Sequence, residues 1–139
     1  MSELAGRLMR NLRGRGLRCR LITTVIVAGK NALHRFKTEL DRAYACVFLT
    51  LDEPQGIAAC EAWSMDVPTL AHWAAGYQAI ATVPYLTDAT GSYWHSVDEL
   101  SAMLADFPRH NFEPRKWVLD NMTDTVCAHK FLQMLDQIQ

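Results

Sequence analysis

The chain has 139 residues, of which 50% are hydrophobic and 21% are charged. A chain of this length corresponds to one domain and buries about 68 to 70% of the surface that its unfolded form exposes. The composition excludes a disordered, collagenous or disulfide-scaffold protein. We therefore expect residues 1–139 to form a single globular domain.

The net charge of −1 is unevenly distributed along the chain. Residues 1–42 contain ten Lys or Arg residues and three acidic ones, a net charge of +7, whereas residues 43–139 carry −8. A basic segment can attract phosphate, nucleic acid or an acidic protein surface, or it can simply form a solvated helix face. No aromatic residue lies among the six arginines of residues 7–20, so a stacking platform for bases is missing. We therefore expect no nucleic-acid partner.

Membrane and metal-binding patterns are also missing from the sequence. The best apolar run, Leu21 to Gly29, is far shorter than the ~20 residues that cross a bilayer. No signal-peptide pattern follows Met1, so we expect a cytoplasmic protein. No two histidines have i, i+4 spacing, and no two cysteines are close in the sequence, so we expect no metal. The cysteines are expected to be reduced and mostly buried, and they are Cys19, Cys46, Cys60 and Cys127.

Helical and strand patterns alternate in the first half of the chain. Leucines at helical spacing predict an amphipathic helix over residues 4–12. A β-branched apolar run predicts a buried strand over residues 21–27. The next expected elements are a helix over 33–44, a strand over 46–51, a short buried helix over 57–65 and a strand over 67–71. This alternation is typical of a doubly wound α/β fold.

The second half of the chain gives weaker signals. A short strand is expected near residues 79–83. Ser96 and Glu99 have the spacing of a capping box and predict the start of a helix. Pro114 suits a first helical turn, and one long helix is expected from there through Leu135. We thus expect a Rossmann-like parallel sheet of about four strands, flanked by helices, with a long C-terminal helix.

The most informative segment lies where the predicted strand over 46–51 passes into the predicted helix over 57–65. Ligands of open α/β sheets bind at the carboxyl ends of the strands, and a helix N-terminus there offers N–H groups and a positive dipole end. Gly56 lets a bulky anion approach the backbone closely. We therefore expect a phosphate to bind at this turn.

Two glutamates flank the turn. Glu53 and Glu61 are eight residues apart, about 10 to 12 Å along a helix, which is comparable to a sugar and a ribose joined through a diphosphate. Glu61 could then accept hydrogen bonds from a ribose diol while Glu53 faces a hexose. On spacing alone, two surface glutamates and a turn are the simpler interpretation.

The two glutamates and the residues after them resemble a known signature. Glu53, seven intervening residues, Glu61 and then a Val67-Pro68 strand resemble the donor site of retaining glycosyltransferases of the two-Rossmann-domain (GT-B) type. The resemblance extends over roughly residues 22–139. It implies that the chain corresponds to the C-terminal, donor-binding domain of such an enzyme.

The resemblance also implies a role for each matching residue. Glu61 would hold the ribose hydroxyls of a nucleotide diphosphate sugar, and Glu53 would be the catalytic residue that contacts the transferred sugar. Gln55, Gly56 and Ile57 would form the turn whose backbone amides meet the sugar and the diphosphate. The nucleotide sugar is a substrate, and no further cofactor or metal is implied.

Two departures from the family pattern limit this expectation. The family's Arg and Lys pair lies on the first strand and helix of this domain, and that strand is not evident here; Lys30 is too close to Glu53 to have that role. The acceptor-binding domain is also missing from these 139 residues, so we expect this chain, as a fragment or as a free-standing gene product, to transfer no sugar alone. The alternative is a non-catalytic α/β module that acts through self-association. In either case we expect a homodimer or a larger assembly.

Overall fold

Three short parallel strands form the centre of the structure. They are β1 (Cys46–Phe48), β2 (Thr69–His72) and β3 (Gly91–Trp94), and β2 lies between the other two. The structure is a computed structural model that describes residues 2–22, 32–49, 56–73, 83 and 85–138. Parallel strands need long crossover connections, and a helix provides the one between β1 and β2. The expected α/β class is therefore confirmed.

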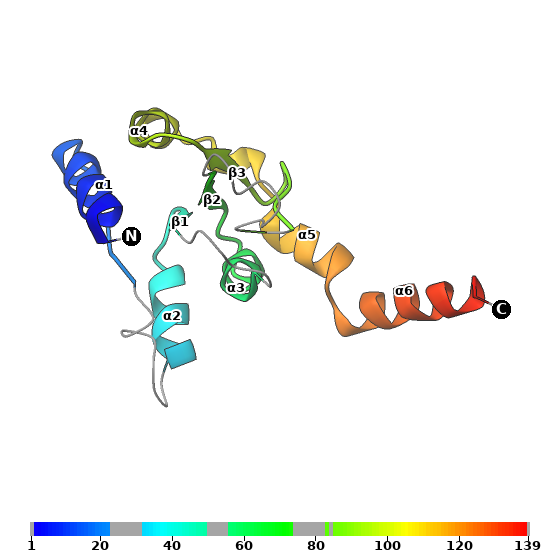
Figure 1. Cartoon of the computed structure of the whole chain (residues 1–139). Helices are drawn as coiled ribbons and strands as arrows, with labels where there is room; N and C mark the ends of the chain where they lie inside the picture. Colours follow the sequence, from blue (N-terminus) through cyan, green and yellow to red (C-terminus); the bar gives the residue numbers. More distant parts are fainter. Residues whose placement is uncertain (1, 23–31, 50–55, 74–82, 84, 139) are drawn as a thin grey trace.

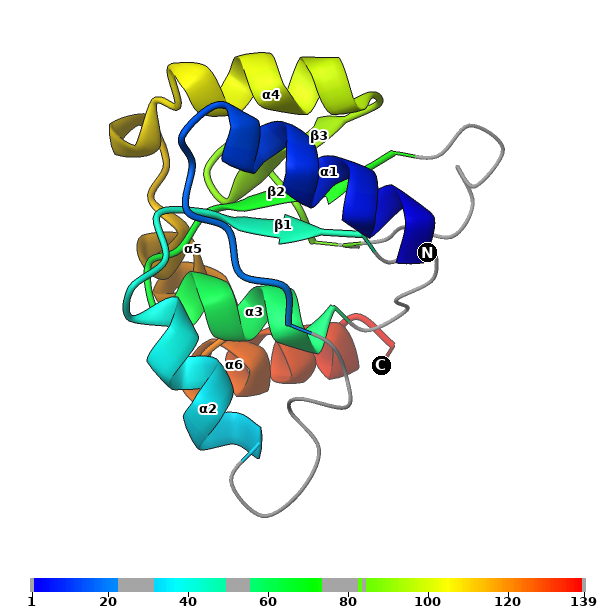
Figure 2. The same cartoon turned by 90° about the vertical axis from the view of Figure 1, so that its left-hand side faces the viewer.

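Helices cover both faces of this sheet (Figure 1, Figure 2). Helices α1 and α4 lie on one face, and α3 and α5 lie on the other. Helix α2 packs beside α3, whereas α6 extends away from the sheet (Figure 1). The helices are α1 (Ser2–Gly14), α2 (Ala32–Leu40), α3 (Ile57–Ser64), α4 (Val97–Ala105), α5 (Pro114–Asn121) and α6 (Asp124–Asp136), with a 3-10 turn over Arg109–Asn111.

The core between the sheet and the helices α1 and α4 is formed by leucines that share one face of each helix. Leu8 and Leu12 of α1 and Leu100 of α4 pack against Leu70 and Trp94 of the sheet. Full burial of a leucine side chain stabilises the fold by about 1.5 to 3 kcal/mol. The indole N–H of Trp94 donates to the carbonyl of Leu70 at 3.2 Å, so its polar atom is satisfied. The predicted first helix is thereby confirmed.

The core on the opposite face is built around α3. Ala59 and Trp63 of this helix are buried against the sheet and against α5. The indole N–H of Trp63 donates to the Thr69 hydroxyl at 3.1 Å, and its ring meets Trp117 edge-on with centroids 5.4 Å apart. Trp63 and Trp94 are both fully buried, so each face of the sheet has one tryptophan in its core.

Strand β3 was not predicted, and its first residue explains why. Gly91 pairs with Thr69 of β2, and a Cβ added to Gly91 would lie 1.9 Å from the Thr69 carbonyl oxygen. Glycine is therefore required there, yet glycine weakens the sequence signal of a strand. The strand expected near 79–83 lies outside the described residues except for Val83, which is in a bend.

The expected number of strands is also corrected. The part of the chain that the structure describes contains three strands, not about four. Of the strand predicted over residues 21–27, Leu21 and Ile22 are irregular, and the rest lies outside the described residues.

The prediction of one long C-terminal helix was wrong. Helix α5 ends at Asn121, and a new helix, α6, begins after Thr123. Thr123 has an extended backbone conformation, and its side-chain hydroxyl accepts a hydrogen bond from the Val126 N–H at 3.3 Å. A capping threonine followed by an aspartate stabilises a helix start, so the chain begins a second helix here.

Helix α2 is also shorter than predicted. It ends at Leu40, so Tyr44 lies beyond its last turn. The Tyr44 hydroxyl donates to the Phe107 carbonyl at 3.2 Å, and the two rings meet edge-on at 5.6 Å. Tyr44 therefore packs against Phe107 and does not continue the helix that its spacing from Leu40 predicted.

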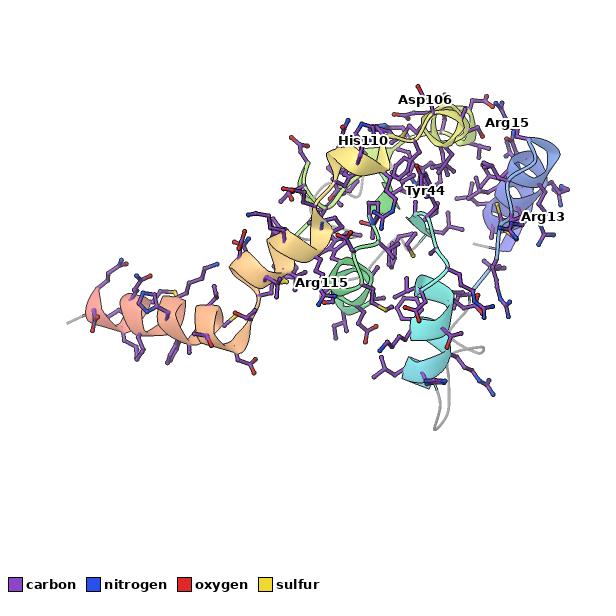
Figure 3. The ribbon with its side chains drawn as sticks, turned by 180° about the vertical axis from the view of Figure 1, so that it is seen from behind. Arg13, Arg15, Tyr44, Asp106, His110 and Arg115 are labelled. Atoms are coloured by element: carbon purple, nitrogen blue, oxygen red, sulfur yellow. The ribbon has the colours of Figure 1, made fainter. Side chains whose placement is uncertain are left out.

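Side chains of the second half of the chain fix the C-terminal end of α3. Asp66, which follows the helix, has φ 61°, and its carboxylate accepts from the Arg115 N–H at 3.3 Å. The Arg115 guanidinium donates to the Ser64 carbonyl at 3.2 Å, reaching from α5 toward α3 (Figure 3). The Arg109 guanidinium donates to the Asp66 carbonyl. The end of α3 is therefore tied to the start of α5.

None of the helices described is long and apolar enough to span a membrane.

Candidate functional site

The predicted donor turn begins outside the described residues. Glu53 and Gln55 lie in that segment, so the roles expected for them stay predictions. The structure does describe Gly56, which is buried and precedes α3 with φ 63° and ψ 26°. Its carbonyl accepts the first helical hydrogen bonds, from the Ala59 and Cys60 N–H groups, both at 3.0 Å. This left-handed conformation favours glycine, which explains the residue type at this position.

Helix α3 carries the other predicted site residues that the structure describes. Ile57 is the first residue of the helix and is 57% exposed. Glu61 is half-buried in the second turn, about 7 to 8 Å along the axis from Gly56. Within the described part of the chain, the Glu61 carboxylate has no hydrogen bond or ion pair. The structure thus brings three of the five predicted residues to one helix start.

A pocket of about 440 Å³ lies at the same edge of the sheet, on the opposite face. It opens between α1 and the carboxyl ends of β2 and β3, where α4 begins. No predicted donor residue that the structure describes lines it. Among the described residues, its lining includes Leu4, Arg7, Arg10 and Asn11 from α1, His72 and Trp94 from the strand ends, and residues 95–98.

Two arginines give this pocket its charge. Arg7 and Arg10 are both exposed, and neither has an ion pair or a hydrogen bond from its guanidinium to another described residue. By contrast, Arg13 donates to the Cys19 carbonyl at 3.3 Å and Arg15 donates to the Asn11 side chain at 3.1 Å, both near the C-terminal end of α1 (Figure 3). The two arginines at the pocket therefore keep their donors for a ligand.

Two histidines lie at the carboxyl ends of the adjacent strands, His72 as the last residue of β2 and His95 directly after β3. The His72 ring lies against Trp94, with centroids 4.4 Å apart and planes tilted by 36°. Burial, and then the charge of His95, lower the pKa of His72, so its imidazole is neutral at pH 7. The Nδ1 atom of His95 lies 3.2 Å from the Glu99 carboxylate. Both histidines add polar groups to the pocket, and the neutral His72 adds no positive charge.

The start of α4 confirms the predicted cap. The Ser96 hydroxyl accepts from the Glu99 N–H at 3.1 Å. The Glu99 carboxylate reaches back to the N–H of His95, the residue before the cap, at 2.7 Å. Side chains of this segment thus hold the Glu99 and His95 N–H groups, and Asp98 is part of the pocket wall.

The cysteines differ from expectation in their exposure. Three are half-buried, whereas Cys127 is exposed on α6, and all four are free thiols. Burial raises the pKa of Cys46 to about 12, and burial is also the main cause of the raised pKa values of Cys19 and Cys60. These three thiols stay protonated at neutral pH and are poor nucleophiles. No group of three or more metal-ligating side chains forms among the residues described.

Sequence reasoning missed the pocket, although it noted the arginines. Arg7 and Arg10 stand three residues apart and therefore share one face of α1. His72 and Trp94 meet them only because β2 and β3 are neighbours, and that pairing could not be predicted without β3.

Comparisons with models of protein families, with curated proteins and with solved structures found no match to this chain.

Proposed function

We propose that this chain is the nucleotide-sugar-binding domain of a retaining glycosyltransferase of the GT-B type. The observation that carries the proposal is the left-handed Gly56 at the start of α3, beside the carboxyl edge of a parallel sheet. A glycine there brings no side chain between the backbone N–H groups of the first turn and a ligand. A diphosphate bound at this point interacts with those N–H groups and with the positive end of the helix dipole.

The second part of the proposal concerns the ribose. The half-buried Glu61 carboxylate lies about 7 to 8 Å along α3 from Gly56, and its acceptor oxygens are not used by another described residue. A carboxylate can accept hydrogen bonds from both hydroxyl groups of a ribose diol. Glu53, which lies outside the described residues, is proposed to contact the transferred sugar because of its place in the motif.

The chain alone is proposed to bind the donor without transferring the sugar. In a complete enzyme, helix amides and basic side chains stabilise the leaving diphosphate, and an acceptor hydroxyl takes the sugar with retained configuration. Positioning of that acceptor supplies a large part of the rate enhancement. A cytoplasmic location belongs to the same proposal, since nucleotide sugars would be met there and the four cysteines are free thiols.

A calorimetric titration of the chain with UDP, GDP and their hexose conjugates tests the proposal. Wild type should show saturable binding, and Glu61→Ala should bind about 10-fold to 150-fold more weakly, because a hydrogen bond to a charged group contributes about 1.5 to 3 kcal/mol. Glu113→Ala, which removes an exposed carboxylate before α5, is the matched control and should bind like wild type. Equal affinities of wild type and Glu61→Ala would remove the donor-site assignment.

A second candidate function is favoured by α6. No residue of this helix is buried, and it exposes five large apolar side chains at or near its end: Phe131, Leu132, Met134, Leu135 and Ile138. Such a surface is typical of a non-catalytic α/β module that acts through self-association. Light scattering separates the candidates together with the titration: assembly without any saturable nucleotide binding would support the second candidate and contradict the first.

A further inference from the structure

The pocket between α1 and the start of α4 has no part in the proposed donor site. We propose that this pocket binds a phosphorylated sugar or a related polyol phosphate, with the phosphate between Arg7 and Arg10 and the hydroxyl groups on Ser96 and Asp98. The volume of about 440 Å³ falls within the range of about 300 to 1,000 Å³ that small-molecule sites occupy. The inference does not depend on the proposed function, since the two sites lie on opposite faces of the sheet.

The position of the phosphate follows from the two guanidinium groups. Arg7 and Arg10 lie on one face of α1, and both line the pocket. Neither guanidinium is engaged by another described residue, so all of their N–H donors are open to a ligand. Planar guanidinium groups match phosphate oxygens in pairs, and two of them together balance a dianion.

The position of the hydroxyl groups follows from the opposite wall. Asp98 places a carboxylate there, which would repel a second phosphate but accepts hydrogen bonds from hydroxyl groups. The Ser96 oxygen accepts from the Glu99 N–H, and its own O–H proton stays available as a donor. The first turn of α4 carries two acidic residues, Asp98 and Glu99, so this wall favours a neutral polyol and not an anion.

The floor of the pocket is suited to the carbon face of a sugar. The half-buried His72 ring packs on Trp94, which is fully buried and supports the ring from below, and the lowered pKa of His72 keeps the imidazole neutral at pH 7. A neutral ring packs against the C–H face of a polyol without the desolvation cost that a charged floor would impose. The gradient from two cations on α1 to a carboxylate on α4 therefore matches a molecule that is anionic at one end only.

Calorimetry with glucose 6-phosphate, ribose 5-phosphate, glycerol 3-phosphate, inorganic phosphate and glucose tests the proposal. At least one of the three polyol phosphates should bind saturably and about tenfold or more tightly than inorganic phosphate. The double variant Arg7→Gln, Arg10→Gln should weaken that binding at least about tenfold. The double variant Arg18→Gln, Arg35→Gln is the matched control: both arginines are exposed and make no described contact, and the loss of charge is the same.

Two further variants separate the parts of the proposal. Asp98→Asn should lower the affinity for the polyol phosphate relative to the affinity for inorganic phosphate, which loses only a repulsive charge. Glu61→Ala, in the donor site, should leave both affinities unchanged, so a failure of either site can be recognised separately. Circular dichroism of each variant checks that it is folded, which we expect because Arg7 and Arg10 make no described hydrogen bonds.

Three results would overturn the proposal. The first is the absence of saturable binding by all three polyol phosphates. The second is an equal loss of affinity in the two double-arginine variants, which would mean that only net charge matters. The third is equal affinity for inorganic phosphate and the polyol phosphates, which would leave a simple anion site.

Discussion

The starts of α3 and α4 lie at the same edge of the sheet but are built in opposite ways. Helix α4 begins with Ser96, whose side chain accepts from the Glu99 N–H, and Glu99 in turn holds the N–H of His95. Helix α3 begins with the left-handed Gly56, which has no side chain to act as a cap. A capping side chain stabilises a helix start by about 0.5 to 2 kcal/mol, a contribution that Ser96 makes to α4 and that Gly56 cannot make to α3.

We interpret the start of α4 as structural and the start of α3 as a candidate binding site. The start of α4 has a side-chain cap, and its first turn is acidic, which disfavours an anion. At α3, stability comes instead from the buried face and from the C-terminal end, which Arg115 and Arg109 tie to Asp66. The residues at the beginning of α3 contribute less to stability, so their backbone N–H groups can serve to bind a ligand.

The largest effect is expected from the buried face of α3. Trp63→Ala should lower the free energy of unfolding by about 3 to 5 kcal/mol, because it empties a fully buried site and removes the hydrogen bond to Thr69. Urea unfolding, followed by far-UV circular dichroism and not by tryptophan fluorescence, measures this free energy. Ile57→Ala, at the exposed start of the same helix, is the control and should cost less than about 0.5 kcal/mol. Similar losses in both variants would show that α3 is not held by its buried face.

The next effect is expected at Gly56. Gly56→Val should destabilise the fold by about 1 to 2 kcal/mol or more, because a β-branched residue is strained at φ 63°. It should also weaken nucleotide-sugar binding, since its side chain obstructs the approach of phosphate to the backbone. Gly56→Asn is the matched variant, because asparagine tolerates left-handed geometry, and its stability should stay closer to wild type. Normal diphosphate binding by a folded Gly56→Val protein would mean that the turn is only structural.

A smaller effect is expected at the start of α4. Ser96→Ala should reduce the free energy of unfolding by about 1 kcal/mol, because the Glu99 N–H loses its acceptor. Affinity for nucleotide sugars should not change, since Ser96 lies on the face away from α3. Calorimetry and urea unfolding of this one variant give both quantities. A loss of nucleotide affinity comparable to that of Glu61→Ala would place the donor at α4 and reverse the comparison.

The smallest effect concerns pH. The hydrogen bond from the His95 N–H is the main cause that holds the pKa of Glu99 below its ordinary value of 4.5. A carboxyl group whose pKa is lower in the folded state stabilises the fold above its unfolded pKa, and this contribution disappears as pH falls through the folded pKa. The Tm advantage of wild type over Glu99→Gln should therefore be present at pH 7 and shrink below pH 4.5. A difference in Tm that is constant over this range would contradict the assignment.

The sequence predicted those elements whose signals are local. Leucine spacing predicted α1, the Ser96 and Glu99 pair predicted the start of α4, and apolar runs predicted β1 and β2. Strand β3 escaped prediction because Gly91 is required by the close approach of the Thr69 carbonyl, a contact between distant residues. The break between α5 and α6 escaped it because apolar spacing continues through the Thr123 cap.

The candidate site was predictable to a different degree on each face. The donor turn is a continuous segment with its own spacing, so Gly56, Ile57 and Glu61 could be placed together at a helix start from sequence. The pocket combines α1 with two strand ends and α4, which are distant in the chain. Only the order of the strands brings them together, and a sequence pattern does not contain that order.

The most direct test of the central claim is an NMR titration of the 15N-labelled chain with UDP and GDP hexose conjugates. The amide signals of residues 56–61 at the start of α3 should shift saturably, whereas those of Asp66 and residues 95–99 should stay nearly constant. The same titration of Glu61→Ala should require about 10-fold or more higher ligand concentrations to reach half-saturation. Saturable shifts confined to residues 95–99, or no saturable shift with any of these nucleotides, would contradict the account.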